Sequence, residues 1–299
     1  MTGFIDEHRG RFGVEPICRV LEAAPSTYYA RKARPPCRRA LEDERLLAQI
    51  RAVHASNYRS YGSRRVWRAL QREGVQVGRC RIERLMRRAR IQGVRRGKRW
   101  QTTKPDPGGA RPADLVERRF AATRPNELWV ADITYVRSFE GLSYFAFVLD
   151  VYSRAIVGWQ LASHLRTDLV LDALEMAVSQ RPLCAGGLVH HSDRGSQYTS
   201  IRYSERLAEL GISASVGSVA DAYDNALAES FVASFKHELV RQHRFRSRDE
   251  AELAVVEWTG WYNQRRLHSA LDDRPPAEHE RIYYRDNNEA TPSKQPSLY

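Results

Sequence analysis

The chain has 299 residues and a net charge of +12, and this length allows two or three domains, each with its own core. It contains no run of about 18 apolar residues, so no membrane-spanning helix is expected. The first residues, MTGFIDEHRGRFGV, carry acids and lack an apolar segment, which excludes a secretory signal.

The four cysteines are scattered along the chain and form no CxxC pair. No histidines accompany them at the spacing of a zinc ligand set. We therefore expect neither a disulfide framework nor a structural zinc site. Small, partly buried thiols in a reducing cytoplasm fit this pattern best. The cysteines are Cys18, Cys37, Cys80 and Cys184.

The first 34 residues predict two short helices. Apolar residues recur with helical spacing in residues 4–22, and Ala23-Ala24-Pro25 ends that helix. Ser26 is expected to cap a second helix over residues 27–31. Together the two helices suggest a small helix-turn-helix segment over residues 1–34. The apolar positions of the first helix are Val14, Ile17, Cys18 and Leu21.

Positive charge is concentrated in one segment that begins at the end of these helices. Residues 31–104 contain 23 Lys and Arg against 5 Asp and Glu, a net of +18, whereas the rest of the chain has a net of −6. Most of these residues are arginine, whose planar guanidinium suits phosphates and guanine edges. The segment predicts a polyanionic partner. A merely solvated surface is the alternative, although such surfaces usually mix both signs.

A basic helical DNA-binding domain is predicted over residues 40–92. One helix begins at Glu42, a second is capped by Ser63 and ends at Gly74, and a third covers residues 79–90. The third helix has an apolar stripe and arginines on its other faces, which is typical of a recognition helix that enters a DNA groove. A solvated basic helix is the alternative. The stripe is Ile82, Leu85, Met86 and Ala89, and the arginines are Arg81, Arg84, Arg87 and Arg88.

Residues 93–119 are rich in Gly, Pro and basic residues and predict a linker. The segments beyond it are first strand-like and then alternate between helix and strand, which indicates a mixed α/β sheet with helices on its faces. We assign residues 120–284 to this domain and residues 285–299 to a polar, disordered tail. The expected strands are 128–136, 143–149, 155–161, 188–191 and 212–216, and the expected helices are 168–179, 203–210, 224–239 and 250–262.

Three carboxylates occupy unusual positions in this α/β domain. Asp132 lies inside an otherwise apolar strand, where a buried carboxylate needs a partner or a metal ion. Asp193 follows a short strand, at a carboxyl end where α/β sheets place ligands. Glu229 lies on a helix, away from its apolar face and together with Lys236. Taken singly, the acids also suit a buried hydrogen-bond acceptor, a turn residue and a surface residue.

Acids from three separate elements converge only if cations bind them, because bare like charges repel one another and raise the pKa of each carboxyl. Oxygen ligands suit Mg²⁺ or Mn²⁺. Two such ions about 4 Å apart would hold the attacking and leaving oxygens of a phosphodiester during in-line displacement. Lys236 is then expected to bind a DNA phosphate near the metal ions.

Thirty-five residues separate Asp193 from Glu229. Three segments resemble the catalytic blocks of the transposase and retroviral integrase superfamily, whose signature is Asp…Asp-x35-Glu: WVADITYV, HSDRGSQYTS and DNALAESFVASFK. Four more are similar to OrfB-type insertion-sequence transposases of bacteria: GVEPICRVLEAAPSTYYA, YGSRRVWRALQREGVQVGRCRIERLMRR, VLDVYSRAIVGW and YNQRRLHSAL. The resemblance covers roughly residues 3–283.

This resemblance implies an RNase H-like fold in which Asp132, Asp193 and Glu229 bind the metal ions and catalyse the reaction. It implies metal-dependent cleavage of the element's ends and strand transfer by a 3′-hydroxyl, on nucleoid DNA. The implied partners are double-stranded terminal repeats and target DNA, further copies of the chain, and the product of an upstream reading frame. The chain begins at Met1 without a heptad segment, so we expect it to be the downstream part of a frameshifted product.

Several further residues have open roles. The neighbours of Asp150 favour a hydrogen-bonded turn over a fourth metal ligand. His191 suits either packing or contact with the metal ions or the scissile phosphate. Asn225 suits either a DNA contact or a helix cap. Two sets remain: Arg265, Arg266 and His268, which suit DNA contact or closure of the fold, and Trp67, Trp129, Trp159, Trp258 and Trp261, which are expected in the core.

Two other functional classes compete with a DDE-type transposase. A pure DNA-binding regulator would use the helical region and keep the α/β domain as an inert scaffold, but it has no need of three acids at this spacing. A general nuclease of the RNase H class, acting on RNA–DNA hybrids, has no need of so long a basic segment. The transposase is therefore the leading hypothesis.

Overall fold

The computed structural model describes residues 1–94, 121–182, 187–193, 195–216 and 226–287. The chain divides into two compact units, Met1–Ala52 and Val53–Tyr299. No helix in the described part of the chain is long and apolar enough to cross a membrane. Most of the expected linker, most of the expected tail, Cys184 and Asn225 lie outside the described residues.

The first unit is a group of short helices around a small core. The single helix expected over residues 4–22 is wrong, because Gly13, with a φ of 77°, divides it into two. Ser26 does not cap the next helix, which begins one residue earlier with Pro25 in its first turn. The helices are α1 (Thr2–Phe12), α2 (Val14–Val20), α3 (Pro25–Ala33) and the first part of α4 (Arg38–Ser56), and the core is Ile5, Ile17, Cys18 and Tyr28.

The second unit begins with a helix-turn-helix-like pair, α5 (Ser63–Arg72) and α6 (Arg79–Arg88). Ser63 does not cap α5, since Gly62 holds that position, and its hydroxyl instead donates to Glu83 of α6 at 3.3 Å. The predicted apolar stripe of α6 is confirmed, because Ile82, Leu85 and Met86 are buried.

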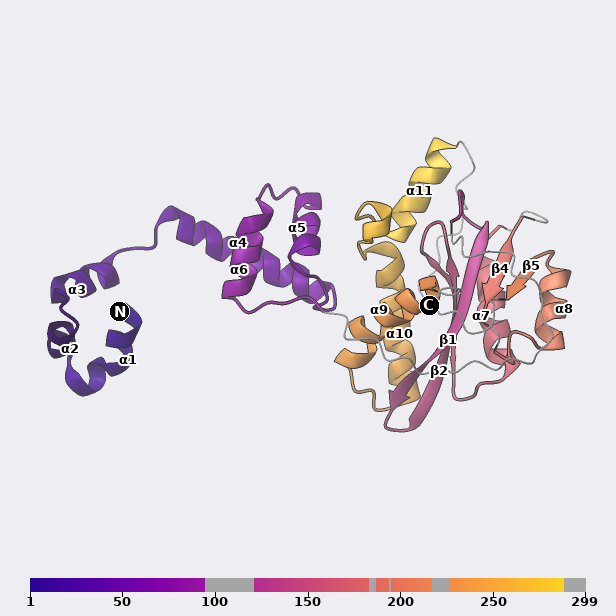
Figure 1. Ribbon diagram of the computed structural model, residues 1–299, viewed down its shortest axis with the longest axis horizontal. Helices are drawn as coiled ribbons and strands as arrows, with labels where there is room; N and C mark the ends of the chain where they lie inside the picture. The colour runs from indigo at the N-terminus through magenta and orange to yellow at the C-terminus, as the bar shows by residue number, and fades with distance from the viewer. Residues whose placement is uncertain (95–120, 183–186, 194, 217–225, 288–299) are drawn as a thin grey trace. The chain divides into compact units, whose positions relative to one another are not determined.

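The α/β part contains a five-stranded sheet with the order β3-β2-β1-β4-β5 (Figure 1). β1 pairs with β2 in antiparallel and with β4 in parallel orientation, so it lies at the centre of the sheet. Each expected strand is present within a few residues of its predicted bounds. The strands are β1 (Leu128–Ser138), β2 (Gly141–Asp150), β3 (Ile156–Ala162), β4 (Val189–Ser192) and β5 (Ser213–Val216).

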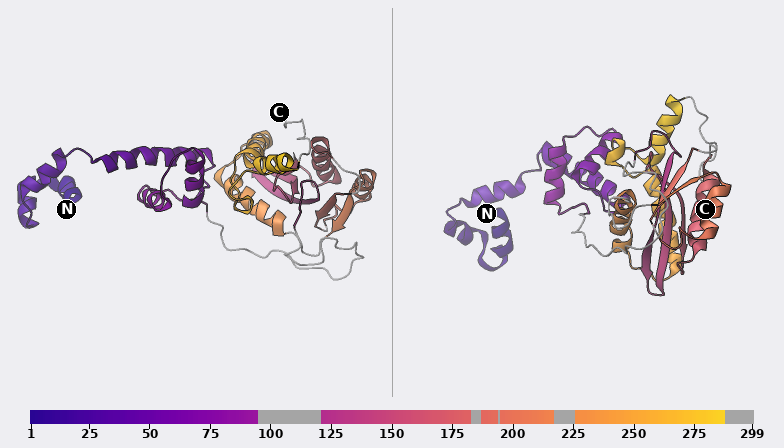
Figure 2. Two further views of the ribbon diagram at one scale, coloured as in Figure 1. Left: turned by 90° about the horizontal axis from the view of Figure 1, so that it is seen from above. Right: turned by 45° about the vertical axis from the view of Figure 1, so that its right-hand side comes forward.

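Helices cover both faces of this sheet (Figures 1 and 2). Trp129 and Ala131 of β1 share one core with α7 and α8. On the other face, Phe231 and Phe235 of α9 pack on the rings of β2, and α10 lies behind them. A last helix, α11, was not predicted. The helices are α7 (Thr167–Gln180), α8 (Ile201–Glu209), α9 (Ala226–Glu238), α10 (Arg248–Gln264) and α11 (Pro276–Asp286).

The tryptophans follow the expected core placement only in part. Trp129, Trp258 and Trp261 are buried. Trp67 and Trp159 are half-buried. The indole N–H of Trp67 donates to the carbonyl of Val77 at 2.9 Å, which holds the turn between α5 and α6.

Gly158 marks the closest approach of helix α7 to strand β3. A Cβ at this position would lie 2.1 Å from the carbonyl oxygen of Ala173 and 2.7 Å from the amide nitrogen of Ala177. We expect Gly158→Ala to lower the free energy of unfolding by about 2–3 kcal/mol, because helix and strand must separate. Urea unfolding measures this. Gly78→Ala, where nothing lies within 4 Å, is the control, and equal stabilities of the two variants would contradict the prediction.

Candidate active site

Asp132 lies in the middle of the central strand, beside the point where β4 ends. Ala131 pairs with Ser192, the last residue of β4. Asp132 and Asp193 are the next residues on the two parallel segments, so they lie beside each other. The side chain of Asp132 is half-buried, and its Oδ1 accepts the backbone N–H of Ile133 at 2.7 Å. The register of the parallel pair therefore places these two acids side by side.

Asp193 is exposed and begins a tight turn. Its Oδ1 accepts the backbone N–H of Gly195 at 2.9 Å. A Cβ on Gly195 would lie 3.1 Å from this oxygen and 3.0 Å from Oε1 of Gln197. A larger residue than glycine would crowd the carboxylate, so the turn fixes where Asp193 points.

Asp132 and Asp193 line one open cavity of about 260 Å³. Its lining residues come from β1, from β2 and from the segments that follow β3 and β4. The sequence did not single out the other lining residues. The available signal for two of them, Gly195 and Gln197, was their place just after Asp193 in the segment HSDRGSQYTS. The other lining residues are Ile133, Thr134, Tyr135, Tyr144, Leu165, Gly195 and Gln197.

Glu229 approaches the same region from the helix that crosses the sheet. It lies in the first turn of α9, two residues before Phe231. The Phe231 ring packs on Phe147 at 4.2 Å between centroids, and Phe147 pairs with Asp132 across the strands. Glu229 does not line the cavity, and no three His, Cys, Asp or Glu side chains of the described residues form a group that could hold a metal ion.

The electrostatics of Asp132 nevertheless link all three acids. Burial, followed by the charge of Asp193, raises the pKa of Asp132 to about 7, and the charge of Glu229 adds to this. The hydrogen bond from the Ile133 amide opposes the shift. The donors are all carboxylate oxygens, which fit a hard divalent cation, and such an ion would relieve the repulsion among them.

Lys236 lies against a residue that lines the cavity. Its ammonium sits 3.6 Å from the centre of the Tyr135 ring and donates to the Tyr135 carbonyl. Burial, with a smaller effect from Arg241, lowers the pKa of Lys236 to about 8. Lys236 therefore places a positive charge beside Tyr135, which lines the cavity.

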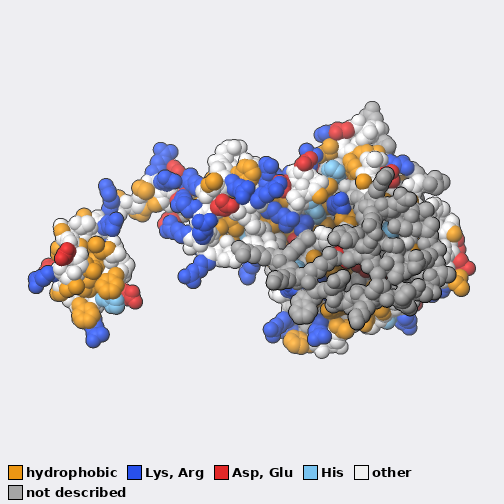
Figure 3. All heavy atoms as spheres, viewed as in Figure 1, with side chains coloured by type: hydrophobic (Ala, Val, Ile, Leu, Met, Phe, Trp, Pro, Cys, Tyr) orange, Lys and Arg blue, Asp and Glu red, His pale blue; other side chains and the backbone are white. Residues whose placement is uncertain are grey.

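The arginines predicted to bind DNA lie on α6. Arg84, Arg87 and Arg88 are exposed, and Arg81 is half-buried. Figure 3 shows Lys and Arg side chains gathered over the helices α5 and α6. The geometry is compatible with a recognition helix, and the role of these arginines stays a prediction.

Asp150 and His191 have structural partners. The carboxylate of Asp150 is fully buried and accepts hydrogen bonds from the Asn126 amide and from the amide and hydroxyl of Ser153, at 2.7, 2.7 and 2.8 Å. This confirms the predicted turn. The ring of His191 is buried, with Nδ1 3.0 Å from the Ser215 hydroxyl, which fits the packing role.

Two domain families match the chain. Integrase core domain matches residues 122–222, and a second family with the same description matches residues 210–276. HTH-like domain matches residues 41–99. These matches cover the α/β part and the basic helical region respectively.

Relatives match over nearly the whole chain. The transposase for insertion sequence element IS629 of Shigella sonnei is 46% identical over 290 residues, which is 95% of this chain and 97% of its own. The chain belongs to the family of bacterial insertion-sequence transposases. A relative from element IS986/IS6110 of Mycobacterium tuberculosis is 52% identical over 266 residues, 87% of this transposase and 96% of its own length.

Solved structures of retroviral integrases are also similar to this transposase. The HTLV-2 integrase catalytic core domain in complex with magnesium aligns with a TM-score of 0.41 and 15% identity, over 53% of this chain and 98% of that one. The simian T-cell lymphotropic virus intasome aligns with a TM-score of 0.46 and 14% identity, over 83% and 76%.

The matches to the domain families and to the transposases confirm the predicted class of protein. The transposase has a helical HTH-like region followed by an integrase core with a mixed α/β sheet, as the sequence predicted. It is an enzyme of the integrase-core type, a polynucleotidyl transferase. The roles of the individual site residues remain predictions.

Proposed function

We propose that the transposase cuts DNA at the ends of its own element and joins the 3′-hydroxyl to target DNA, with Asp132, Asp193 and Glu229 as metal ligands. One observation carries this proposal. Asp132 and Asp193 line the same cavity, and the charges of Asp193 and Glu229 both raise the pKa of Asp132. Acids arranged in this way gain most from a bound cation.

Bound there, two Mg²⁺ or Mn²⁺ ions would stabilise the attacking and leaving oxygens of the phosphodiester. The chain's own groups orient the ligands: the Ile133 amide holds Asp132, and the Gly195 amide holds Asp193. Lys236 supplies a positive charge at Tyr135 for a phosphate of the substrate. The exposed arginines of α6 bind the duplex outside the cavity.

The proposal extends to partners and location. The substrates are double-stranded terminal repeats and target DNA of the bacterial nucleoid, in the cytoplasm. Joining two ends requires at least two copies of the chain on the DNA. The product of an upstream reading frame is a further candidate partner, which an assay with and without it can test.

A gel assay on labelled duplex with the element's terminal repeat tests the chemistry. We expect nicking at the repeat's end with Mg²⁺ or Mn²⁺ and none in EDTA, because the carboxylates alone carry no positive charge to the phosphate. Asp132→Asn and Glu229→Gln should each lower the nicking rate at least about 100-fold. Nicking in EDTA, or nicking by both variants, contradicts the assignment. Binding without nicking calls for the same assay on the product fused to the upstream segment.

A further inference from the structure

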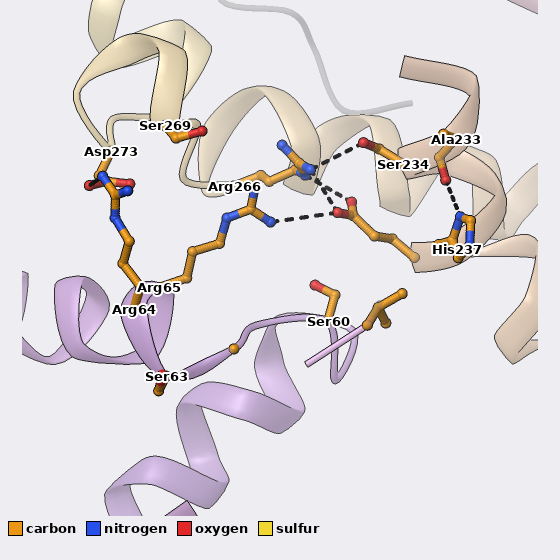
Figure 4. Close-up of a pocket in the computed structure, with 13 residues that line it drawn as sticks. Ser60, Ser63, Arg64, Arg65, Ala233, Ser234, His237, Arg266, Ser269 and Asp273 are labelled. Atoms are coloured by element: carbon orange, nitrogen blue, oxygen red, sulfur yellow. Dashed lines mark hydrogen bonds and ion pairs between the residues drawn. The ribbon is translucent and has the colours of Figure 1, made fainter. Parts of the chain in front are cut away.

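A second cavity, of about 440 Å³, lies between α5, the C-terminal half of α9 and the chain that follows α10 (Figure 4). It is named the arginine pocket here. Arg64 and Arg65 extend into it from α5, and Arg266 extends from the opposite side (Figure 4). Two segments quoted above, YGSRR and YNQRRLHSAL, thus meet in one pocket although about 200 residues separate them.

Arg266 and Glu238 of α9 form the most buried ion pair of the pocket. The guanidinium binds the carboxylate through two atoms, with Nε 2.8 Å from Oε2 and a terminal nitrogen 2.7 Å from Oε1. Both side chains are only 6% exposed. Arg65 approaches the same carboxylate at 3.8 Å. Two guanidiniums therefore share one negative charge.

A second carboxylate, that of Asp273, is shared in the same way. Arg64 and Arg68 lie 3.2 and 3.1 Å from its Oδ2. Around the pocket, four guanidiniums thus face two carboxylates. Burial and the charges of Arg266 and Arg65 push the pKa of the nearby His268 well below its usual range, so its ring is neutral and leaves the balance of charges unchanged. The walls carry a net positive charge.

Arg65 is the least satisfied of these groups. Its side chain is 28% exposed, and it makes no hydrogen bond with the described residues beyond its distant ion pair with Glu238. Its guanidinium carbon lies 5.6 Å from the centre of the Tyr61 ring. Burial and the charge of Arg266 lower the pKa of Arg65. A guanidinium has five donors, so this one is ready for an anion with several acceptor oxygens.

The walls around Arg65 are held by buried hydrogen bonds. The indole N–H of Trp261 in α10 donates to Asn57 at 3.1 Å, and the backbone N–H of Leu267 donates to the Tyr61 hydroxyl at 2.8 Å. These bonds join the segment before α5 to the C-terminal helices. The pocket is therefore formed in advance and does not need a ligand to assemble it.

We propose that the arginine pocket binds a phosphate of the DNA backbone through Arg65, with Arg64 beside it. DNA is favoured as the source because Ala233 of the pocket lies four residues after Glu229 of the proposed active site, on the same face of helix α9 and about 6 Å along its axis. A DNA strand carries one phosphate per about 3.4 Å of axis, so a strand at Glu229 reaches the pocket within a few nucleotides. The inference rests on DNA as substrate and not on the chemistry at the acids.

Binding to a short fluorescent duplex of arbitrary sequence, measured by anisotropy in EDTA between about 50 and 200 mM salt, tests the pocket without any cleavage. We expect Arg65→Gln to weaken binding about tenfold and to lower the slope of log K against log salt by about 1. Arg72→Gln is the matched control, because Arg72 lies on the same helix, 43% exposed, and does not line the pocket. It should change affinity less than about twofold.

Asp273→Asn should change the DNA affinity in the opposite direction, because it removes a negative charge from the wall of the pocket. We expect it to bind the duplex several-fold more tightly. Arg65→Lys keeps the charge without the planar fork and should bind with intermediate affinity, which covers the case in which Arg65→Gln does not fold. Equal affinities of Arg65→Gln and Arg72→Gln, or weaker binding by Asp273→Asn, overturn the proposal. The proposal is also overturned if inorganic phosphate raises the melting temperature of the parent while Arg65→Gln keeps the salt slope of the parent. The pocket would then bind a free anion and not a phosphate of DNA.

Discussion

Asp193→Asn is expected to abolish strand cleavage, with a loss of at least about 1,000-fold in the single-turnover rate. The substitution removes the charge that a divalent cation needs, at an exposed carboxylate beside Asp132. It keeps an oxygen that still accepts the Gly195 amide, so the turn stays intact. The affinity for the same duplex should change less than about threefold, because the α6 arginines and the arginine pocket lie elsewhere.

Two measurements separate the catalytic role of Asp193 from a structural one. Cleavage is followed on labelled repeat-end duplex with Mg²⁺, and affinity is followed by anisotropy in EDTA. Asp168→Asn serves as the control, since Asp168 is an exposed acid of α7 that pairs with Arg202 at 2.8 Å and lies outside the cavity. A parallel loss of binding and cleavage in Asp193→Asn would mean that Asp193 only supports the turn.

The strands of the α/β part were predictable because their side chains carry the information locally. β1 and β2 are apolar runs on either side of a hairpin, and most of their residues are buried. Asp132 stood out for the same reason, as a charge in an apolar strand. Asp132 and Asp193 lie close together because β1 and β4 pair in parallel. The order of the strands in the sequence did not predict this pairing.

The arginine pocket was not predictable, since its contacts join distant parts of the chain. Arg64 and Arg68 meet Asp273 more than 200 residues away, and Arg266, in the segment after α10, meets Glu238 of α9. The spacing of apolar residues shows which face of a helix is buried, but it does not show which other part of the chain that helix contacts. The sequence therefore left Arg266 and His268 open between DNA contact and closure of the fold, and both prove to be buried.

Errors at helix ends have a different cause. Gly13 and Ser63 stood in sequences that suit more than one local structure, and neighbouring residues decided the outcome. Gly13 has a positive φ of 77°, which glycine adopts readily, and it ends α1. The hydroxyl of Ser63 finds Glu83 and leaves the cap to Gly62. Such choices depend on a few tenths of a kcal/mol, which pattern reading does not resolve.

Asp132→Asn is expected to stabilise the metal-free protein, and to stabilise it clearly more at pH 8 than at pH 5. The folded protein holds the pKa of Asp132 at about 7, against about 3.9 for an unfolded chain. The carboxyl's contribution to stability is therefore fully present below about pH 4 and is lost as pH rises through 7. At pH 8 the charged carboxylate costs the parent on the order of 2–4 kcal/mol, and the asparagine variant avoids this cost.

Thermal unfolding in EDTA from pH 5 to 8 measures the difference between Asp132→Asn and the parent, which cancels the titration of all other groups. The difference should grow with pH and reach several degrees at pH 8. Mg²⁺ should then raise the melting temperature of the parent and not that of the variant, because the ion binds the charged carboxylates and offsets their repulsion. A difference that is flat with pH would mean that the three acids do not act on one another. A flat difference combined with metal-dependent cleavage would place the metal ligands at other residues, so this experiment also tests the geometry on which the proposed chemistry depends.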